Sequence, residues 1–154
     1  YRRQRQMCIR DRNVTSLLRT EETGKMASKT SKYAAVRTKL VALQRGLAKK
    51  TDVIMDGRDI GTTVLPDAFA KIYLTASSDA RAKRRYDELK EKGENCSFDA
   101  IKEDIEKRDY EDMHRAISPL KQADDAVLVD TSDMNIEQVV AALSKIIDEK
   151  KAGR

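Results

Sequence analysis

The sequence of 154 residues has few of the residues on which several common kinds of site depend. Its two cysteines form no CxxC or Cys/His spacing, so no zinc motif is present, and reduced thiols of a cytoplasmic protein are the favoured interpretation. Tryptophan is absent, and the two Phe and five Tyr are scattered, which gives no stacking platform for single-stranded nucleic acid. No apolar run approaches the roughly 18 residues of a membrane-spanning helix, so none is predicted.

The glycine-rich loop that binds nucleotide phosphates is also missing from the sequence. The pattern G-x-x-x-x-G-K-S/T occurs nowhere in the chain. Residues 23–25 read TGK, but the first glycine is absent at the required spacing and Met26 follows, so we interpret this as a chance match. His114, the single histidine, has no metal-ligand partner and no nucleophile nearby in sequence, and it is interpreted as a surface residue.

The charge balance points only weakly to an anionic partner. The chain has 31 basic and 26 acidic residues, a net charge of +5, but part of the surplus lies at its two ends, in YRRQRQ and EKKAGR. Residues 1–12 show no apolar period, and MCIRDR resembles a translated sequencing adapter. We therefore expect a non-native or disordered leader, with a basic arm that touches nucleic acid as the alternative. Residues 13–154 are expected to form part of one domain.

Hydrophobic patterning predicts alternating strands and helices. Apolar residues recur on one helical face over residues 35–49, and short apolar runs predict strands. Capping residues mark the other helices: Ser77 with Gly93, Ser97 with Pro119 as a stop, and Asn135 with Gln138 before a last helix with a broad apolar face. Such alternation predicts an α/β fold with a parallel sheet covered by helices on both faces. The predicted strands are 53–55, 71–76 and 126–130.

The stretch DVIMDGRDIG joins a predicted strand to a charged turn. Open α/β sheets bind ligands at the carboxyl ends of their strands, which is where Arg58 and Asp59 fall. Arginine matches phosphate with two hydrogen bonds, a carboxylate accepts from hydroxyl or amine donors, and Gly57 and Gly61 let a backbone approach a ligand closely. A charged turn without a ligand is the alternative.

A second candidate lies on the helix predicted after Ser97. The apolar stripe of Ile101 and Ile105 continues, on a helical projection, through Arg108, Asp112 and Arg115. Buried charges cost several kcal/mol each unless they are paired or bind a ligand. This stripe is therefore either a surface ladder of ion pairs or a pocket wall that presents cations to phosphate and a carboxylate to sugar hydroxyls.

A third group contains Arg81, Arg84 and Arg85, one helical turn apart on a mostly polar helix. A solvated helix face is the ordinary explanation of such a run. A clamp that closes over nucleotide phosphates is the other interpretation.

Taken in order, the motifs DGRDIGTTVLPDAFAKIYLTAS, RRYDELKEKG and KRDYEDMHRAISPLKQADDAVLVDTS closely resemble the bacterial cytidylate kinase family. The likeness extends from about Asn13 to the C-terminal helix. It implies the fold of a P-loop nucleoside monophosphate kinase, with the first strand and the P-loop missing here. The implied regions are the end of a substrate-binding region and a core helix (13–50), core strands (51–76), a lid region (77–97) and further core (98–154).

The resemblance implies transfer of the γ-phosphoryl group of ATP, with Mg²⁺, to CMP or dCMP, giving CDP or dCDP. It implies a cytoplasmic monomer that acts on small nucleotides, not on nucleic acid or membranes. Because the phosphate-binding loop is absent from the sequence, we expect little or no activity from this chain alone. A basic nucleotide- or nucleic-acid-binding module without catalysis is the alternative function.

The resemblance also assigns residues to nucleotide contacts, with no nucleophile and no metal ligand among them. The position of His114 is usually Asn in the family. The assigned residues are, for the cytosine base, Ser28, Arg37 and Asp59; for the acceptor phosphate, Arg58 and Arg115; for the sugar hydroxyls, Asp112 and Arg108; and for the ATP phosphates, Arg81, Arg84 and Arg85.

Overall fold

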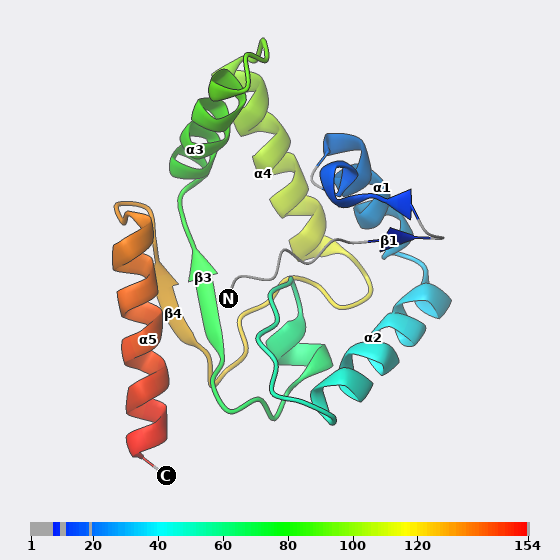
Figure 1. The fold of residues 1–154 in the computed structure, drawn as a ribbon, viewed down its shortest axis with the longest axis vertical. Helices are drawn as coiled ribbons and strands as arrows, with labels where there is room; N and C mark the ends of the chain where they lie inside the picture. The colour runs from blue at the N-terminus through cyan, green and yellow to red at the C-terminus, as the bar shows by residue number, and fades with distance from the viewer. Residues whose placement is uncertain (1–7, 10–11, 19, 154) are drawn as a thin grey trace. The chain divides into compact units, whose positions relative to one another are not determined.

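A computed structural model describes residues 8–9, 12–18 and 20–153 (Figure 1). The chain divides into two compact units, Tyr1–Leu47 and Ala48–Arg154. Most of the predicted leader, residues 1–7 and 10–11, lies outside the described residues. Within the part that is described, no helix is both long enough and apolar enough to cross a bilayer.

Unit 1 consists of short pairings followed by helices. Strands β1 (Cys8–Ile9) and β2 (Arg12–Asn13) pair antiparallel, and a 3₁₀ turn, η1 (Thr15–Leu17), follows. Helix α1 (Glu21–Thr30) starts at Thr20, whose side chain accepts a hydrogen bond from the Thr23 backbone N–H. This helix was not predicted, although a threonine cap followed by two acidic residues is a readable start signal.

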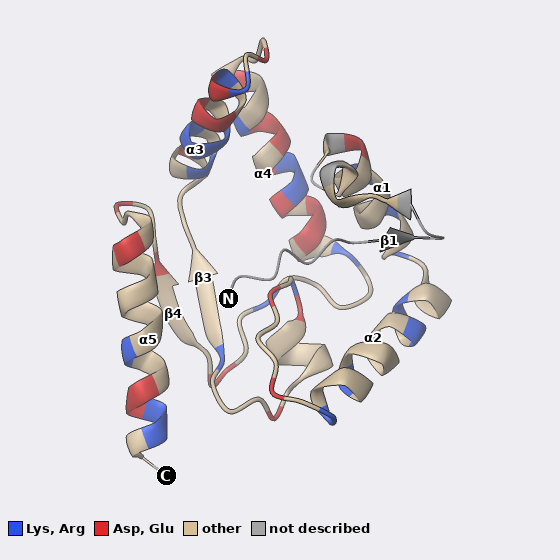
Figure 2. Cartoon of the chain, in the orientation of Figure 1, with Lys and Arg blue, Asp and Glu red and all other residues tan. Residues whose placement is uncertain are grey.

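Helix α2 (Ala34–Ala48) confirms the helix predicted over residues 35–49. Its apolar stripe is nevertheless largely open to solvent, with Leu43 58% exposed and Leu47 51% exposed. None of the residues of α2, all of which are described, is buried. Figure 2 shows basic residues on this helix and no acidic ones.

Unit 2 is built on a parallel two-stranded sheet. Strands β3 (Ile72–Thr75) and β4 (Val127–Asp130) pair from Ile72 opposite Val127 to Thr75 opposite Asp130. Both strands confirm predicted ones. Val64, Ala82 and Val129 are its buried apolar residues.

The strand predicted over residues 53–55 is wrong. These residues are irregular, pair with no strand among the described residues, and leave Ile54 fully exposed. An apolar run becomes a strand only when a neighbour supplies ladder hydrogen bonds, and a local pattern does not report whether that neighbour is present. A short π-helical turn, η2 (Ile60–Val64), follows the charged turn and was not predicted.

Helices α3 (Ser78–Glu91) and α4 (Phe98–His114) form a hairpin that leads away from β3 (Figure 1). The Ser77 and Ser97 side chains cap their starts, as predicted. After α3 the backbone N–H groups of Gly93 and Glu94 bond to the Lys90 and Leu89 carbonyls, a Schellman ending that requires the positive φ of 76° at Gly93.

Helix α5 (Ile136–Ala152) begins with the predicted capping box of Asn135 and Gln138. Its predicted apolar face is not sequestered. Every residue of α5 is described and none is buried, and Ile136 is 79% exposed.

Candidate functional site

Asp112 lies at the centre of a charged cluster in unit 2. It sits in the last turn of α4 and is 7% exposed. Arg58 donates from its Nε to Oδ2 of Asp112 at 2.8 Å, and Nη1 of Arg115 lies 3.8 Å from Oδ1. Arg58, Asp112 and Arg115, hereafter the Asp112 cluster, therefore bring together the two places that the sequence singled out separately, the DGRD turn and the end of the charged helix.

Arg115 reaches Asp112 from outside the helix. The predicted stripe continued through Arg115 at helical spacing, and this is wrong, because α4 ends at His114 and Arg115 has an extended backbone (φ −65°, ψ 142°). The turn is closed by Nε of Arg115, which donates to the Ser118 carbonyl at 2.5 Å, and by the Leu120 N–H, which donates to the Asp112 carbonyl at 2.8 Å. The guanidinium so held is favoured by the negative end of the helix dipole.

One donor of the cluster lacks a protein acceptor. Among the described residues, Nη2 of Arg115 is buried and has no hydrogen-bond partner. Leaving a buried charged donor unpaired costs free energy, and such a group in a native protein is commonly matched by an ordered water or a ligand. An anion placed beside Arg115 would accept that bond, which makes the cluster suited to phosphate or carboxylate.

Asp59 is placed beside the turn that carries Arg58. It is 7% exposed and precedes η2, and its carbonyl accepts from the Thr63 N–H at 2.8 Å. Side-chain packing explains why glycine occupies the two neighbouring positions, 57 and 61. A Cβ on Gly57 would lie 3.0 Å from the Ile60 side chain, and one on Gly61 would lie 3.2 Å from the Lys71 side chain. These glycines allow protein side chains to approach closely, and the approach of a ligand stays a prediction.

The α3 arginines, Arg81, Arg84 and Arg85, are all bonded to protein groups. Arg81 forms a two-bond pair with Asp109 of α4, at 3.0 and 2.5 Å, and this hydrogen-bonded carboxylate raises the pKa of Arg81 above its ordinary value. Arg84 donates to the Thr131 and Met134 carbonyls beyond β4, and Arg85 pairs with Glu88 on its own helix at 2.9 Å.

Further polar contacts link the two helices of the hairpin. Lys102 of α4 pairs with Asp79 at 2.8 Å, and the Ser78 hydroxyl donates to Glu106 at 2.8 Å. Figure 2 shows acidic and basic residues on both helices. These polar contacts join the first turn of α3 to α4, and the edge-to-face contact of Tyr86 and Phe98 joins the two helices nearer the turn between them.

Three other predicted residues, Arg108, Ser28 and Arg37, lie on helices. Arg108 is exposed on α4, one turn before Asp112. Ser28 lies on α1 and Arg37 on α2, both partly exposed and both in unit 1. His114 is exposed, as predicted, and stacks on the Tyr110 ring at 4.0 Å between centroids.

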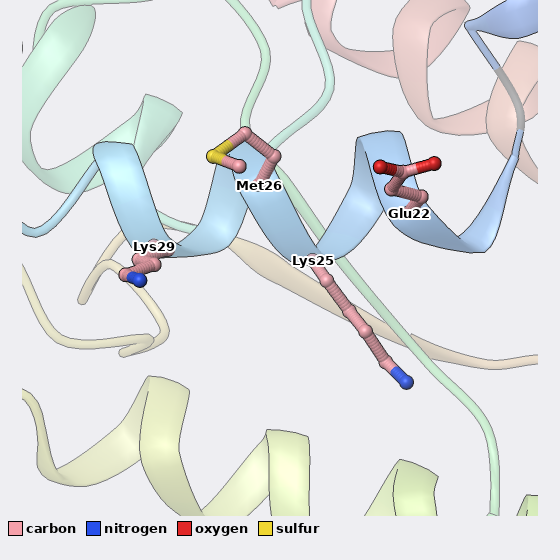
Figure 3. Close-up of a pocket in the computed structure, with 4 residues that line it drawn as sticks. All are labelled: Glu22, Lys25, Met26 and Lys29. Carbon is pink, nitrogen blue, oxygen red and sulfur yellow. The ribbon is translucent and has the colours of Figure 1, made fainter.

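A shallow hollow in unit 1 does not coincide with any predicted site residue. It is lined by Glu22, Lys25, Met26 and Lys29, all from α1 (Figure 3). In Figure 3 the two lysine side chains leave the same side of the helix, away from Met26. A hollow bounded by one helix offers a ligand too little enclosure to count as a binding pocket.

A comparison with protein-family models matches residues 1–149 to the family described as cytidylate kinase. The chain belongs to the cytidylate kinase family. This confirms the resemblance read from the motifs, together with the expected fold class, that of P-loop nucleoside monophosphate kinases. The parallel pairing of β3 with β4 agrees with that class.

Individual relatives give the same result. The chain is 50% identical over 143 residues to the cytidylate kinase of Lactobacillus johnsonii, covering 93% of this chain and 62% of that protein. It is 46% identical over 142 residues to the cytidylate kinase of Thermosipho melanesiensis, covering 92% and 65%. That of Bacteroides thetaiotaomicron is 48% identical over 133 residues, covering 86% and 58%. The chain therefore spans less than two thirds of the length of these relatives.

Proposed function

We propose that the protein to which this chain belongs transfers the γ-phosphoryl group of ATP to CMP or dCMP, giving CDP or dCDP. Relatives at about 50% identity carry the name cytidylate kinase, which supports this substrate class. We further propose that it acts as a cytoplasmic monomer on small nucleotides and not on nucleic acid.

The observation that carries the proposal is the Asp112 cluster. Arg58 and Arg115 would hold the phosphate of CMP, and the unpaired Nη2 of Arg115 supplies a donor for one of its oxygens. Phosphoryl transfer depends on positioning and charge neutralisation more than on a covalent partner, so a site of arginines without a nucleophile suits the reaction.

The other assignments remain part of the proposal. Ser28, Arg37 and Asp59 would read the cytosine base, and Arg108 with Asp112 would meet the sugar hydroxyls. The α3 arginines would meet the ATP phosphates only by exchanging their present protein partners for phosphate oxygens. Mg²⁺ would be bound with the ATP phosphates. No group of three or more acidic, histidine or cysteine side chains in the described part of the chain could hold a metal, so no protein ligand is assigned to it.

The test is a phosphotransfer assay on the complete reading frame, obtained by resequencing the coding region upstream of Asn13. We expect ADP formation with ATP and CMP or dCMP, and much less with AMP or UMP. Preference for AMP or UMP would contradict the substrate assignment. This chain, which has no G-x-x-x-x-G-K-S/T sequence, is expected to have little or no activity in the same assay.

A binding measurement distinguishes the proposed kinase from the alternative function. A basic binding module without catalysis would bind mixed oligonucleotides with an affinity that falls steeply as salt rises. The kinase proposal expects such binding to be weak beside the binding of CMP.

A further inference from the structure

The carboxylate of Asp112 is occupied by arginines in this structure. One oxygen accepts from Nε of Arg58 at 2.8 Å, and the other faces Nη1 of Arg115 at 3.8 Å. Its partner Arg58 comes from a turn 54 residues earlier in the chain, and Arg115 comes from the loop after the helix. A contact made only with a sugar hydroxyl would not account for these two partners.

Asp112 is placed where a carboxylate is costly by itself. It is almost fully buried, and it lies at the C-terminal end of α4, where the helix dipole disfavours negative charge. The two guanidinium groups offset both costs. The carboxylate also fixes the orientation of these two long side chains in the folded protein. Their rotamer entropy is therefore already lost before a ligand binds, and binding does not have to supply that cost.

The backbone of Asp112 also holds the loop of residues 115–120 in place. Its carbonyl accepts from the Leu120 N–H, which closes residues 115–120 against the helix end, and Nε of Arg115 is bound to the Ser118 carbonyl within that loop. Nε of Arg115 is hydrogen bonded to that carbonyl and Nη1 lies 3.8 Å from Asp112, while the buried Nη2 has no partner among the described residues and is available to an incoming oxygen.

We infer that Asp112 is a positioning residue, which holds Arg58 and Arg115 in place for the acceptor phosphate before the nucleotide arrives. This inference rests on the proposed function for the identity of the anion. It adds a role to the expected sugar contact: Asp112 contributes to binding of the phosphate through the two arginines.

The first test needs no ligand. Arginine Nε–H signals in ¹H–¹⁵N spectra exchange slowly with water when the group is hydrogen bonded. In the unmodified chain we expect slowly exchanging Nε–H signals from Arg58 and Arg115. In Asp112→Asn the Arg58 signal should exchange at least about tenfold faster, while Asp104→Asn, a matched change at an exposed position of the same helix, should leave it unaltered. An Arg58 signal unchanged in Asp112→Asn would overturn the inference.

The second test isolates the phosphate. The ratio of the affinities for dCMP and 2′-deoxycytidine measures what the phosphate contributes, and neither ligand has a 2′-hydroxyl for Asp112 to contact. We expect Asp112→Asn to lower this ratio about 10-fold to 100-fold by titration calorimetry, and Asp112→Glu to recover part of it. If Asp112→Asn leaves this ratio unchanged and weakens the binding of CMP but not that of dCMP, Asp112 contacts only the sugar. That result would contradict the positioning role.

The two tests separate the failure of this inference from the failure of the proposed function. If the unmodified chain and the complete protein bind no cytidine nucleotide, the proposed function fails. The exchange measurement on Arg58 then still decides whether Asp112 holds the arginines.

Discussion

Two groups of arginines in unit 2 look alike in sequence and differ in what their guanidinium groups contact. The α3 arginines each bond to a protein carboxylate or carbonyl and tie α3 to α4, to the segment after β4, or to the next turn of the same helix. In the Asp112 cluster, two guanidinium groups converge on one buried carboxylate, and Nη2 of Arg115 keeps a donor without a protein acceptor in the described part of the chain. Arginines that are close in sequence therefore indicate a ligand site less well than guanidinium donors that have no protein acceptor in the structure.

The largest difference between the groups should appear in nucleotide binding. We expect Arg115→Ala to weaken binding of CMP about 10-fold to 100-fold, because a charged hydrogen-bond donor to phosphate is lost. Arg85→Ala, which removes an exposed pair with Glu88, should leave the affinity within a factor of two or so. Titration calorimetry on folded variants checks both. Equal losses for the two variants would remove the distinction between the groups.

For the stability of the α3–α4 hairpin, we expect the α3 arginines to matter because of the contacts they make with protein groups. Arg81→Ala should lower the free energy of unfolding by about 1–2 kcal/mol, because it breaks a two-bond pair between α3 and α4 that is only partly exposed. Lys83→Ala breaks an exposed pair with Asp87 on the same helix and should cost no more than about 0.5 kcal/mol. Urea unfolding of both variants makes the comparison, and a larger loss from Lys83→Ala would contradict it.

The turn that joins the two helices offers a smaller test. Gly93 has a φ of 76°, so Gly93→Ala should cost about 1 kcal/mol through backbone strain. Gly46→Ala in the last turn of α2, where an added methyl meets nothing within 4 Å, should stabilise by up to about 1 kcal/mol. Thermal unfolding of the two variants should show shifts of opposite sign. A stabilising Gly93→Ala would argue against the Schellman ending.

The smallest effect concerns an exposed carboxylate, in contrast to buried Asp112. Lys71 hydrogen-bonds to Asp125 at 2.6 Å and lowers the pKa of that carboxyl below its ordinary value of 3.8. The stabilisation from this pair is therefore present above pH 3.8 and is lost as the pH falls through the lowered pKa. A carbon-13 NMR titration should give an Asp125 midpoint below 3.8, rising towards 3.8 in Lys71→Met. A midpoint at or above 3.8 in the unmodified chain would contradict the pair.

The sequence predicted those elements whose signals are local. Ser77, Ser97 and Asn135 cap helices at the expected places, and Gly93 ends α3, because a cap involves only residues within one helical turn. The strand at residues 53–55 failed for the opposite reason, since pairing depends on a neighbour elsewhere in the chain.

The site was predicted in part by the same logic. Spacing indicated that the end of α4 carries a charged stripe and left open whether it forms a surface ladder or a pocket wall; Asp112 is buried there. It did not indicate that Arg115 leaves the helix, because the hydrogen bond from Leu120 to Asp112 that folds the loop back is not visible in a helical projection. Nor did it indicate that Arg58 pairs with Asp112, a contact between distant segments.

The most direct test of the account is a titration of the chain with CMP, followed through the arginine side-chain signals in ¹H–¹⁵N spectra. We predict that signals of Arg58 and Arg115 shift with CMP, because the proposed phosphate site lies at the Asp112 cluster, and that those of Arg81 and Arg84, for which ATP is the proposed ligand, do not. Shifts of Arg81 or Arg84 without shifts of Arg58 and Arg115 would contradict it.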